Sequence, residues 1–261
     1  MTTEFLVARR DIIAGRLADG HEVNATALAH EFSVSEDAIR RDLRALAAEG
    51  RCRRVYGGAL PLLPVSPAST PLVQRIGEGQ QRKAALGQAA ASLVQRGECV
   101  FLDSGSSNLA IVGFLPREYG LTVATNAVQI AVAAMARADL QLVMVGGMVD
   151  PATGGCIDAQ AVEQVRLLNI DRCFLGACAV SAGSGIGAFN PADAMFKRVL
   201  LAASAHVAVL ATTDKLETRA PHRVGAVADI AQLIVEHDAP AASLAALARA
   251  GAVIVTAAPP A

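Results

Sequence analysis

Short apolar segments recur between residues 99 and 255 of this 261-residue chain, and helical segments separate them. Strands are expected at Cys99–Leu102, Leu121–Ala124, Leu140–Val145, Cys173–Leu175, Val207–Leu210, Leu233–Val235 and Val253–Val255. Helices are expected from Gln80 to Gln95 and near 107–115, 127–137, 159–168, 192–204 and 240–249. Continuous apolar strands that alternate with helices favour a mostly parallel sheet covered on both faces. Residues 73–261 are therefore predicted to form a doubly wound α/β domain.

Composition limits the classes of protein that fit this pattern. The chain is 53% hydrophobic, yet no apolar run reaches the ~18–20 residues that a membrane span needs. The N-terminus has no basic segment followed by an apolar one, so a signal peptide is not expected. Five scattered cysteines form no CxxC pair, and the histidines lack metal-ligand spacing. We expect a cytoplasmic protein with no membrane partner, no disulfide framework and no metal.

Small and polar residues follow five successive strands of the predicted sheet. In such sheets, ligands bind outside the carboxyl ends of the strands, and Gly/Ser loops offer backbone N–H groups and hydroxyls to a phosphate. The alternative is that Gly and Ser are simply the residues that βα turns use. We favour a phosphorylated small molecule as effector. The candidate effector-binding residues are Asp103, Ser104, Gly105, Ser106, Ser107, Thr125, Asn126, Gly146, Gly147, Gly176 and Lys215.

Two further features of this domain bear on the kind of ligand it binds. No G-x-G-x-x-G follows the first strand and no G-x-x-x-x-G-K-[ST] occurs, so neither a dinucleotide cofactor nor a P-loop is supported. Asp193 and Lys197 are four residues apart on a predicted helix. They can form an exposed i,i+4 ion pair or contribute to the ligand pocket, and the sequence leaves both readings open. We expect no cofactor.

A short arginine-rich helix precedes this domain, between Val34 and Leu46. Ser35 can cap it, and Ile39, Leu43 and Leu46 recur at the spacing of a core stripe. Six arginines lie between residues 40 and 54, and the basic segment that begins at Arg51 is closed by the Gly pair 57–58. This concentration favours nucleic-acid contact over a solvated charged surface. The candidate DNA-binding residues are Ser35, Ala38, Arg40, Arg41, Arg44, Arg51, Arg53 and Arg54.

Two helices are expected before the arginine helix, at 4–19 and from an Asn24 cap to Phe32. Three helices followed by a basic hairpin are typical of a winged helix-turn-helix, whose third helix enters the major groove of double-stranded DNA. Residues 1–59 are assigned to this domain. Four prolines between 60 and 72 predict a stiff linker there. The formal net charge is only −1, as expected for a protein that docks in one orientation.

Two sets of motifs resemble those of DeoR-type transcriptional regulators. The first set is Val34-Ser35, Ala38-Ile39-Arg40-Arg41-Asp42-Leu43, Gly50 and Arg54-Val55-Tyr56-Gly57-Gly58-Ala59. The second is Arg75, Lys83, Leu102-Asp103-Ser104-Gly105-Ser106-Ser107, Thr125-Asn126, Gly146-Gly147, Asp171, Phe174-Leu175-Gly176, Lys197-Arg198 and Asp214-Lys215. The resemblance implies an effector domain related in fold to ribose-5-phosphate isomerase and CoA transferases. It also implies a sugar phosphate or similar ligand and an oligomeric, usually repressing, regulator.

The chain departs from the family pattern at two places. Ala38 replaces the usual Thr, so a hydroxyl near the DNA is lost, although an Ala methyl can pack against a thymine methyl. The usual Ser-Gly-Thr-Thr loop is Ser-Gly-Ser-Ser at residues 104–107, which retains both hydroxyls.

The fold relationship also raises the alternative of a sugar-phosphate isomerase-like enzyme with a regulatory DNA-binding head. The isomerases that resemble this domain carry Asp-Gly-Ala-Asp, whereas residues 175–178 here read Leu-Gly-Ala-Cys. Proton abstraction needs a positioned base, so binding without turnover is expected, with no catalytic residue. A protein-docking adaptor is the third hypothesis. We predict a DNA-binding repressor that responds to a phosphorylated metabolite and forms homo-oligomers.

Overall fold

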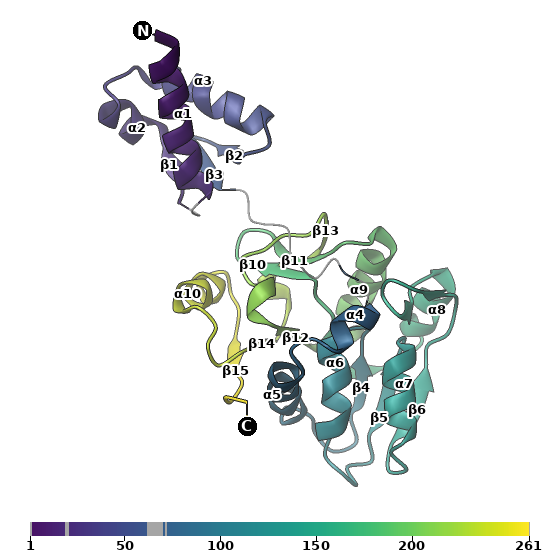
Figure 1. The fold of residues 1–261 in the computed structure, drawn as a ribbon. Helices are drawn as coiled ribbons and strands as arrows, with labels where there is room; N and C mark the ends of the chain where they lie inside the picture. The colour runs from purple at the N-terminus through teal and green to yellow at the C-terminus, as the bar shows by residue number, and fades with distance from the viewer. Residues whose placement is uncertain (1, 19–20, 62–69, 71, 261) are drawn as a thin grey trace. The chain divides into compact units, whose positions relative to one another are not determined.

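The computed structural model describes residues 2–18, 21–61, 70 and 72–260 (Figure 1). Contacts divide the chain into two compact units, Met1–Pro64 and Val65–Ala261. Most of the predicted proline linker lies outside the described residues. At its two ends, Leu60 and Pro61 still belong to a strand, and Leu72 already begins a helix.

The N-terminal unit contains three helices and a small antiparallel sheet. Its elements are α1 (Thr2–Ala18), β1 (Val23–Asn24), α2 (Ala25–Glu31), α3 (Glu36–Ala48), β2 (Cys52–Val55) and β3 (Gly58–Pro61). The sheet order is β1-β3-β2, and β2 and β3 form the predicted wing. Sequence-encoded caps begin two of the helices, since Asn24 accepts from the backbone N–H of Thr26 at 2.9 Å and Ser35 accepts from that of Ala38 at 3.3 Å.

The arginine helix packs through the predicted stripe. Ile39, Leu43 and Leu46 are buried in one cluster with Ile13 and Leu17 of α1. The opposite side of α3 is left exposed, and this side carries the arginines.

The returning strand of the wing begins at Gly58. This position is a glycine because no side chain fits there. A Cβ at this position would lie 2.0 Å from the carbonyl oxygen of Val23, on the neighbouring strand β1. Gly57, in the turn before it, has a φ of 81°, a value that glycine adopts without steric cost. The Gly pair therefore sets both the wing's turn and its attachment to the helices.

The C-terminal unit is built around a seven-stranded sheet whose neighbouring strands are all parallel. Its strands are β4 (Cys99–Leu102), β5 (Thr122–Thr125), β6 (Gln141–Met144), β9 (Ile170–Leu175), β12 (Ser204–Ala211), β14 (Gln232–Val235) and β15 (Ile254–Thr256). The order across the sheet is β15-β14-β12-β9-β4-β5-β6. Each of the seven predicted strands is present, with ends that move by up to three residues.

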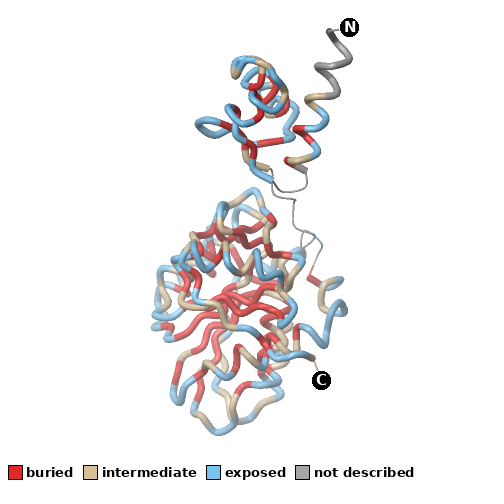
Figure 2. Tube along the Cα trace, turned by 90° about the vertical axis from the view of Figure 1, so that its left-hand side faces the viewer, coloured by how far each residue is buried: buried red, intermediate tan, exposed pale blue. Residues whose placement is uncertain are grey.

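Helices cover both faces of this sheet, as predicted (Figure 1). They are α4 (Leu72–Ile76), α5 (Gln80–Ala91), α6 (Ser106–Ile111), α7 (Val128–Met135), α8 (Ala159–Arg166), α9 (Pro191–Ala203) and α10 (Ala241–Arg249), with short 3-10 turns η2 (Val112–Phe114), η3 (Thr213–Lys215) and η4 (Val227–Asp229). One apolar cluster joins the sheet to α5, α6 and α7, and another joins it to α8, α9 and α10. The inner strands of the sheet are largely buried, whereas the edge strands β6 and β15 are not (Figure 2). Helix α5 ends at Ala91, four residues before the predicted end.

Two small antiparallel sheets were not predicted. Strands β7 (Val149–Asp150) and β8 (Gly155–Cys156) form a hairpin, and β10 (Ala179–Ser181), β11 (Gly185–Ala188) and β13 (His222–Gly225) form a three-stranded sheet. These strands have two to four residues. Segments this short carry little periodicity, so tertiary pairing decides their conformation.

Among the described residues, no helix combines the length and the apolar character that crossing a bilayer requires.

Candidate functional site

The side of the sheet on which successive strands are added changes at β4. From β4 the chain adds β5 and β6 on one side, and then β9, β12, β14 and β15 on the other. A crevice is expected at the carboxyl ends of the strands at such a switch point. Two hollows lie there, and both are lined by Arg75 and Lys215.

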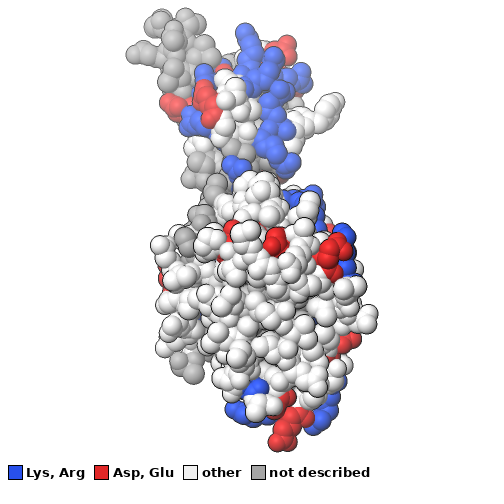
Figure 3. Space-filling model, turned by 90° about the vertical axis from the view of Figure 1, so that its right-hand side faces the viewer, with Lys and Arg blue, Asp and Glu red and all other residues white. Residues whose placement is uncertain are grey.

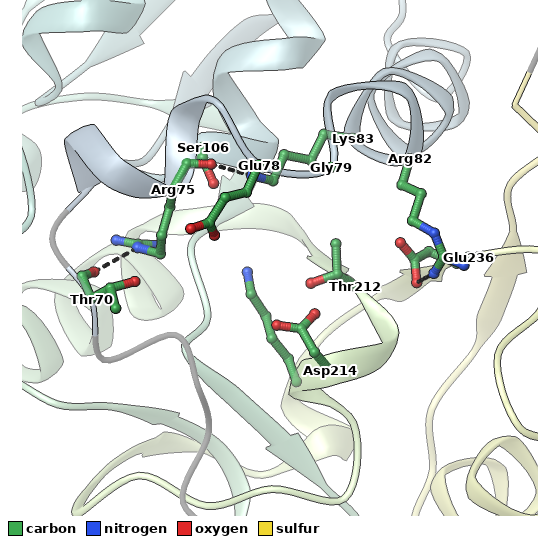
Figure 4. Close-up of a pocket in the computed structure, with 11 residues that line it drawn as sticks. Thr70, Arg75, Glu78, Gly79, Arg82, Lys83, Ser106, Thr212, Asp214 and Glu236 are labelled. Carbon is green, nitrogen blue, oxygen red and sulfur yellow. Dashed lines mark hydrogen bonds and ion pairs between the residues drawn. The ribbon is translucent and has the colours of Figure 1, made fainter.

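The larger hollow has a volume of about 260 Å³. Arg75 and Thr70 lie at one end of it, Arg82 and Glu236 lie at the other, and Thr212 and Asp214 lie between them (Figure 4). The smaller hollow, of about 40 Å³, is bounded by polar loops after β4 and β9. Its lining residues include Ser104, Gly105, Ser107, Asn108, Thr153, Gly176, Cys178, Asp193 and Lys197.

A buried ion cluster forms the floor of the smaller hollow. Lys197 Nζ lies 2.7 Å from Asp103 Oδ2 and 2.7 Å from Asp193 Oδ1. Burial by itself would lower the pKa of Lys197, but attraction to Asp103 and Asp193 outweighs it and raises the pKa above its ordinary value. Asp103 also accepts from the backbone N–H of Ser104 and of Gly176, each at 2.8 Å. The cluster therefore fixes the loops that follow β4 and β9.

Three further polar side chains hold these loops in place. Thr125 Oγ1 donates to the Leu102 carbonyl at 2.6 Å, and Asn126 Oδ1 accepts from the Ser104 N–H at 3.1 Å. Asn108 Nδ2 bridges the carbonyl oxygens of Asp103 and Phe174, at 2.9 and 2.8 Å. These bonds join the ends of three adjacent strands, so the loop 103–108 is rigid before any ligand arrives.

Three cations, Arg75, Lys83 and Lys215, gather where the two hollows meet, and the carboxylates of Glu78 and Asp214 also line the larger hollow (Figure 4). Lys215 is only 7% exposed, and its ammonium forms no hydrogen bond or ion pair with a described residue. Burial lowers its pKa to about 8. Burial also lowers the pKa of Lys83, whose ammonium donates to the Arg75 carbonyl. An ammonium that has no partner among the described residues, on a largely buried side chain beside Arg75 and Lys83, is an anion-binding arrangement.

Five buried side-chain oxygens lack a hydrogen-bond partner among the described residues, and two of them belong to residues that line the hollows. They are Ser107 Oγ in the smaller hollow and Glu236 Oε1 in the larger one. The other carboxylate oxygen of Glu236, Oε2, is fully engaged. It accepts from Arg82 Nη1 at 2.8 Å and from the N–H and Oγ1 of Thr213 at 2.8 and 2.5 Å.

The structure brings six of the eleven predicted effector residues to the hollows: Ser104, Gly105, Ser106, Ser107, Gly176 and Lys215. The side chains of Asp103, Thr125 and Asn126 instead bond to the protein in the loops behind them. Gly146 and Gly147 lie beyond β6, at the sheet edge. Gly146 exchanges two hydrogen bonds with Gln164, at 3.0 and 2.9 Å. These two glycines line neither hollow.

Sequence reasoning about strand ends missed several lining residues. Arg75 and Lys83 come from α4 and α5, which precede the sheet, so no strand-end rule points to them. Glu236 follows β14 directly, and extending the same rule by one strand would have found it. The Asp193–Lys197 pair is buried rather than exposed, at 3% and 2%. Asp103, which lies 2.7 Å from Lys197, is the partner that sequence spacing could not supply.

A second candidate site lies on the N-terminal unit. All six arginines between residues 40 and 54 are exposed, and Figure 3 shows basic side chains gathered along one side of this unit. Arg41, Arg44, Arg53 and Arg54 have no carboxylate partner among the described residues. These guanidinium groups are free to contact an anionic partner.

Arg40 is held differently from the other arginines. Its Nη2 lies 2.7 Å from Glu36 Oε2, and Glu36 Oε1 accepts from Thr26 Oγ1 at 2.7 Å. Glu36, Thr26, Arg40, Arg54 and Tyr56 line a concave surface between α2, α3 and the wing. Tyr56, at the wing tip, is fully exposed. Helix α3 and the wing therefore border one common surface.

No group of three or more potential metal-ligating side chains occurs among the described residues.

Two family models match the chain. The DeoR-like helix-turn-helix domain matches residues 9–62, and the DeoR C-terminal sensor domain matches residues 78–237. The chain is 31% identical to the uncharacterized HTH-type transcriptional regulator YgbI of Escherichia coli (strain K12), over 93% of this chain and 94% of that protein. It is 27% identical to a putative aga operon transcriptional repressor of Escherichia coli O157:H7, over 95% and 92%. It is also 26% identical to the glycerol-3-phosphate regulon repressor of Escherichia coli (strain K12), over 78% and 81%.

Among solved structures, the full-length sorbitol operon regulator SorC from Klebsiella pneumoniae overlaps 95% of this chain and 99% of its own, with a TM-score of 0.44 and 11% identity. A D-ribose-5-phosphate isomerase in complex with phospho-erythronic acid overlaps 51% of this chain and 52% of its own, with a TM-score of 0.37 and 13% identity.

Proposed function

The chain belongs to the DeoR family of transcriptional regulators, and on this basis we propose that it represses transcription under the control of a phosphorylated sugar or a related metabolite. The N-terminal unit binds operator DNA, and the C-terminal unit binds the effector. The relatives named above are regulators and repressors rather than enzymes, which supports a sensor that binds its ligand without turnover.

The observation that carries the proposal is the ammonium of Lys215, which belongs to a largely buried side chain that lines both hollows and has no hydrogen-bond or ion-pair partner among the described residues. A buried charge without a partner is unfavourable, and a phosphate group would supply the missing one. The smaller hollow suits a group of this size, between Ser107, Arg75 and Lys215. The larger hollow, with about 260 Å³, then takes the carbon skeleton of the effector.

On the DNA side, α3 is assigned to the major groove and the wing to the adjacent backbone. Arg41, Arg44, Arg53 and Arg54 are free to reach phosphates or guanine edges. Arg40 and Arg51 first have to leave Glu36 and Glu49, which hold them in the unbound protein. Ser35 caps the helix, and we assign Ala38, in its first turn, to an apolar contact with a base.

Regulation requires that the effector bind the DNA-competent and DNA-incompetent forms with different affinity. Helix-turn-helix proteins commonly read paired half-sites, so we also propose that the chain works as a homo-oligomer. The site of action is the cytoplasm, where both operator DNA and phosphorylated metabolites occur.

The test is footprinting of the promoter next to the protein's own gene, with and without a panel of phosphorylated sugars and polyols. We expect a protected site whose occupancy one of these compounds changes. A protein with no protected site under any condition is not a repressor of that promoter. Turnover of ribose 5-phosphate that is abolished by Lys215→Met would instead favour the isomerase-like alternative.

A further inference from the structure

Glu236 presents a buried carboxylate oxygen to which no described residue donates a hydrogen bond. The side chain is 3% exposed, and its Oε1 has no hydrogen-bond partner among the described residues. Its Oε2 takes the ion pair with Arg82 and both donors of Thr213. Polar atoms buried in this way are rare in proteins, because losing water without gaining a partner is costly. The exception therefore points to a partner outside the described residues.

The position of Glu236 indicates where such a partner would come from. The residue lines the larger hollow at the end opposite Arg75 and Thr70 (Figure 4). A molecule seated in the hollow that Glu236 lines can supply this donor. Arg75, Lys83 and Lys215 supply cations at the junction, whereas the far end holds the Glu236 carboxylate together with its ion-pair partner Arg82.

We propose that Glu236 is a specificity-determining residue that selects effectors carrying a hydrogen-bond donor, a hydroxyl or an amino group, at the end remote from their phosphate. This inference rests on the proposed function, since it assumes that the phosphate occupies the cationic end. A carboxylate accepts hydrogen bonds and donates none when ionised. It therefore raises the affinity for an effector that ends in an O–H or N–H group and lowers it for one with an apolar or acceptor-only end.

A matched pair of residues separates this role from a structural one. Arg82 binds Glu236 through Nη1 at 2.8 Å and Asp238 through Nη2 at 2.6 Å. Asp238 is half exposed and does not line the hollow. Asp238→Asn therefore disturbs the same arginine without touching the wall of the hollow. Glu236→Gln keeps the shape and can retain an acceptor for Arg82 and Thr213, while it places an amide N–H₂ at the position of Oε1.

The experiment measures the affinity of the full-length protein for inorganic phosphate, hexyl phosphate, 6-hydroxyhexyl phosphate and 6-aminohexyl phosphate by calorimetry. The flexible six-carbon chain lets the terminal group find Glu236. In the wild type, a terminal hydroxyl or amine should raise the affinity over hexyl phosphate by on the order of tenfold, the gain expected for hydrogen bonds to a charged group. Comparison of 6-hydroxyhexyl phosphate with 6-aminohexyl phosphate shows which donor is preferred.

Glu236→Gln should abolish the gain from the amine and reduce that from the hydroxyl, whereas Asp238→Asn should preserve both. Binding of inorganic phosphate should be the same in Asp238→Asn as in the wild type. Equal affinity of the wild type for the three hexyl compounds, or an undiminished gain in Glu236→Gln, would overturn the role of Glu236. Absence of binding by every phosphate compound, or binding that Lys215→Met leaves unchanged, would instead overturn the proposed phosphate site.

Discussion

Lys197 on α9 places its ammonium 2.7 Å from the carboxylate of Asp103, at the carboxyl end of β4. The two residues are 94 positions apart in sequence, and both are almost completely buried, with exposures of 2% and 0%. Asp193 completes the cluster at 2.7 Å from the same ammonium. One lysine therefore holds together the helix and the loop that border the smaller hollow.

Replacing Lys197 with Met should destabilise the C-terminal unit strongly. The change leaves Asp103 and Asp193 buried without a counter-charge, and breaking a buried pair in this way costs about 3–5 kcal/mol. Urea unfolding gives the free energy. The matched control is Arg166→Met, which removes an exposed pair with Glu163 and should cost less than about 1 kcal/mol. Similar losses in the two variants would show that the buried cluster is not structural.

Effector affinity should fall at alkaline pH because of Lys215. Its pKa is lowered to about 8, so the protonated form that attracts a phosphate is lost as the pH rises through that value. A phosphate monoester is already dianionic above pH ~7, so the affinity should be constant near neutrality and then fall up to about tenfold per pH unit. Calorimetry between pH 6.5 and 9.5 measures this. Lys215→Met should bind weakly throughout and show a smaller decline, since Lys83 still titrates.

The lowered pKa of Lys215 makes effector affinity fall with rising pH, but it should make the stability of the ligand-free protein rise. The unfolded chain holds its lysine proton up to pH ~10.4, whereas folded Lys215 releases it near pH 8. Between these values the unfolded state binds more protons, so the contribution of Lys215 to the free energy of unfolding rises with pH. Lys215→Met lacks this titration. Its free energy of unfolding should therefore exceed that of the wild type most at pH 8, and the difference should narrow by pH 10. A constant difference would contradict burial of a charged Lys215.

Single arginines of the wing and the arginine helix should contribute to DNA binding through their charge. Arg44→Ala and Arg53→Ala should each weaken operator binding and, if each arginine contacts a phosphate, reduce the slope of log K against log salt by about 0.9. Electrophoretic mobility shifts at several salt concentrations give this slope. Arg16, an exposed arginine of the same unit that pairs with Glu31, provides the control Arg16→Ala. If all three variants retain the wild-type slope, the protein-docking hypothesis gains support.

Gly58→Ala should disrupt the wing and spare the sensor. The new Cβ would lie 2.0 Å from the Val23 carbonyl oxygen, and a backbone atom cannot rotate away. Overpacking of this kind costs about 1–3 kcal/mol, so DNA affinity should fall while phosphate binding by the other unit is retained. Gly15→Ala, in a helix with no atom within 4 Å of the new methyl, should instead raise stability slightly. Normal operator binding by Gly58→Ala would mean that the wing does not contribute.

The sequence by itself determined the elements whose signal is local. The caps at Asn24 and Ser35, the buried stripe of the arginine helix and all seven strands of the parallel sheet follow from residue type and spacing over a few positions. Continuous apolar strands imply two covered faces, and hence the doubly wound arrangement, before any coordinates are seen. The clustering of arginines likewise identified a candidate DNA-binding surface.

Only the tertiary structure decided how the strand-end residues divide between binding and support. Asp103, Thr125 and Asn126 looked like ligand groups because they follow strands, yet their hydrogen bonds go to the protein. Arg75 and Glu236 enter the same hollow from α4 and from the end of β14. Which side chains meet there depends on the order of the strands across the sheet and on contacts over long sequence separations, and neither is encoded in local periodicity.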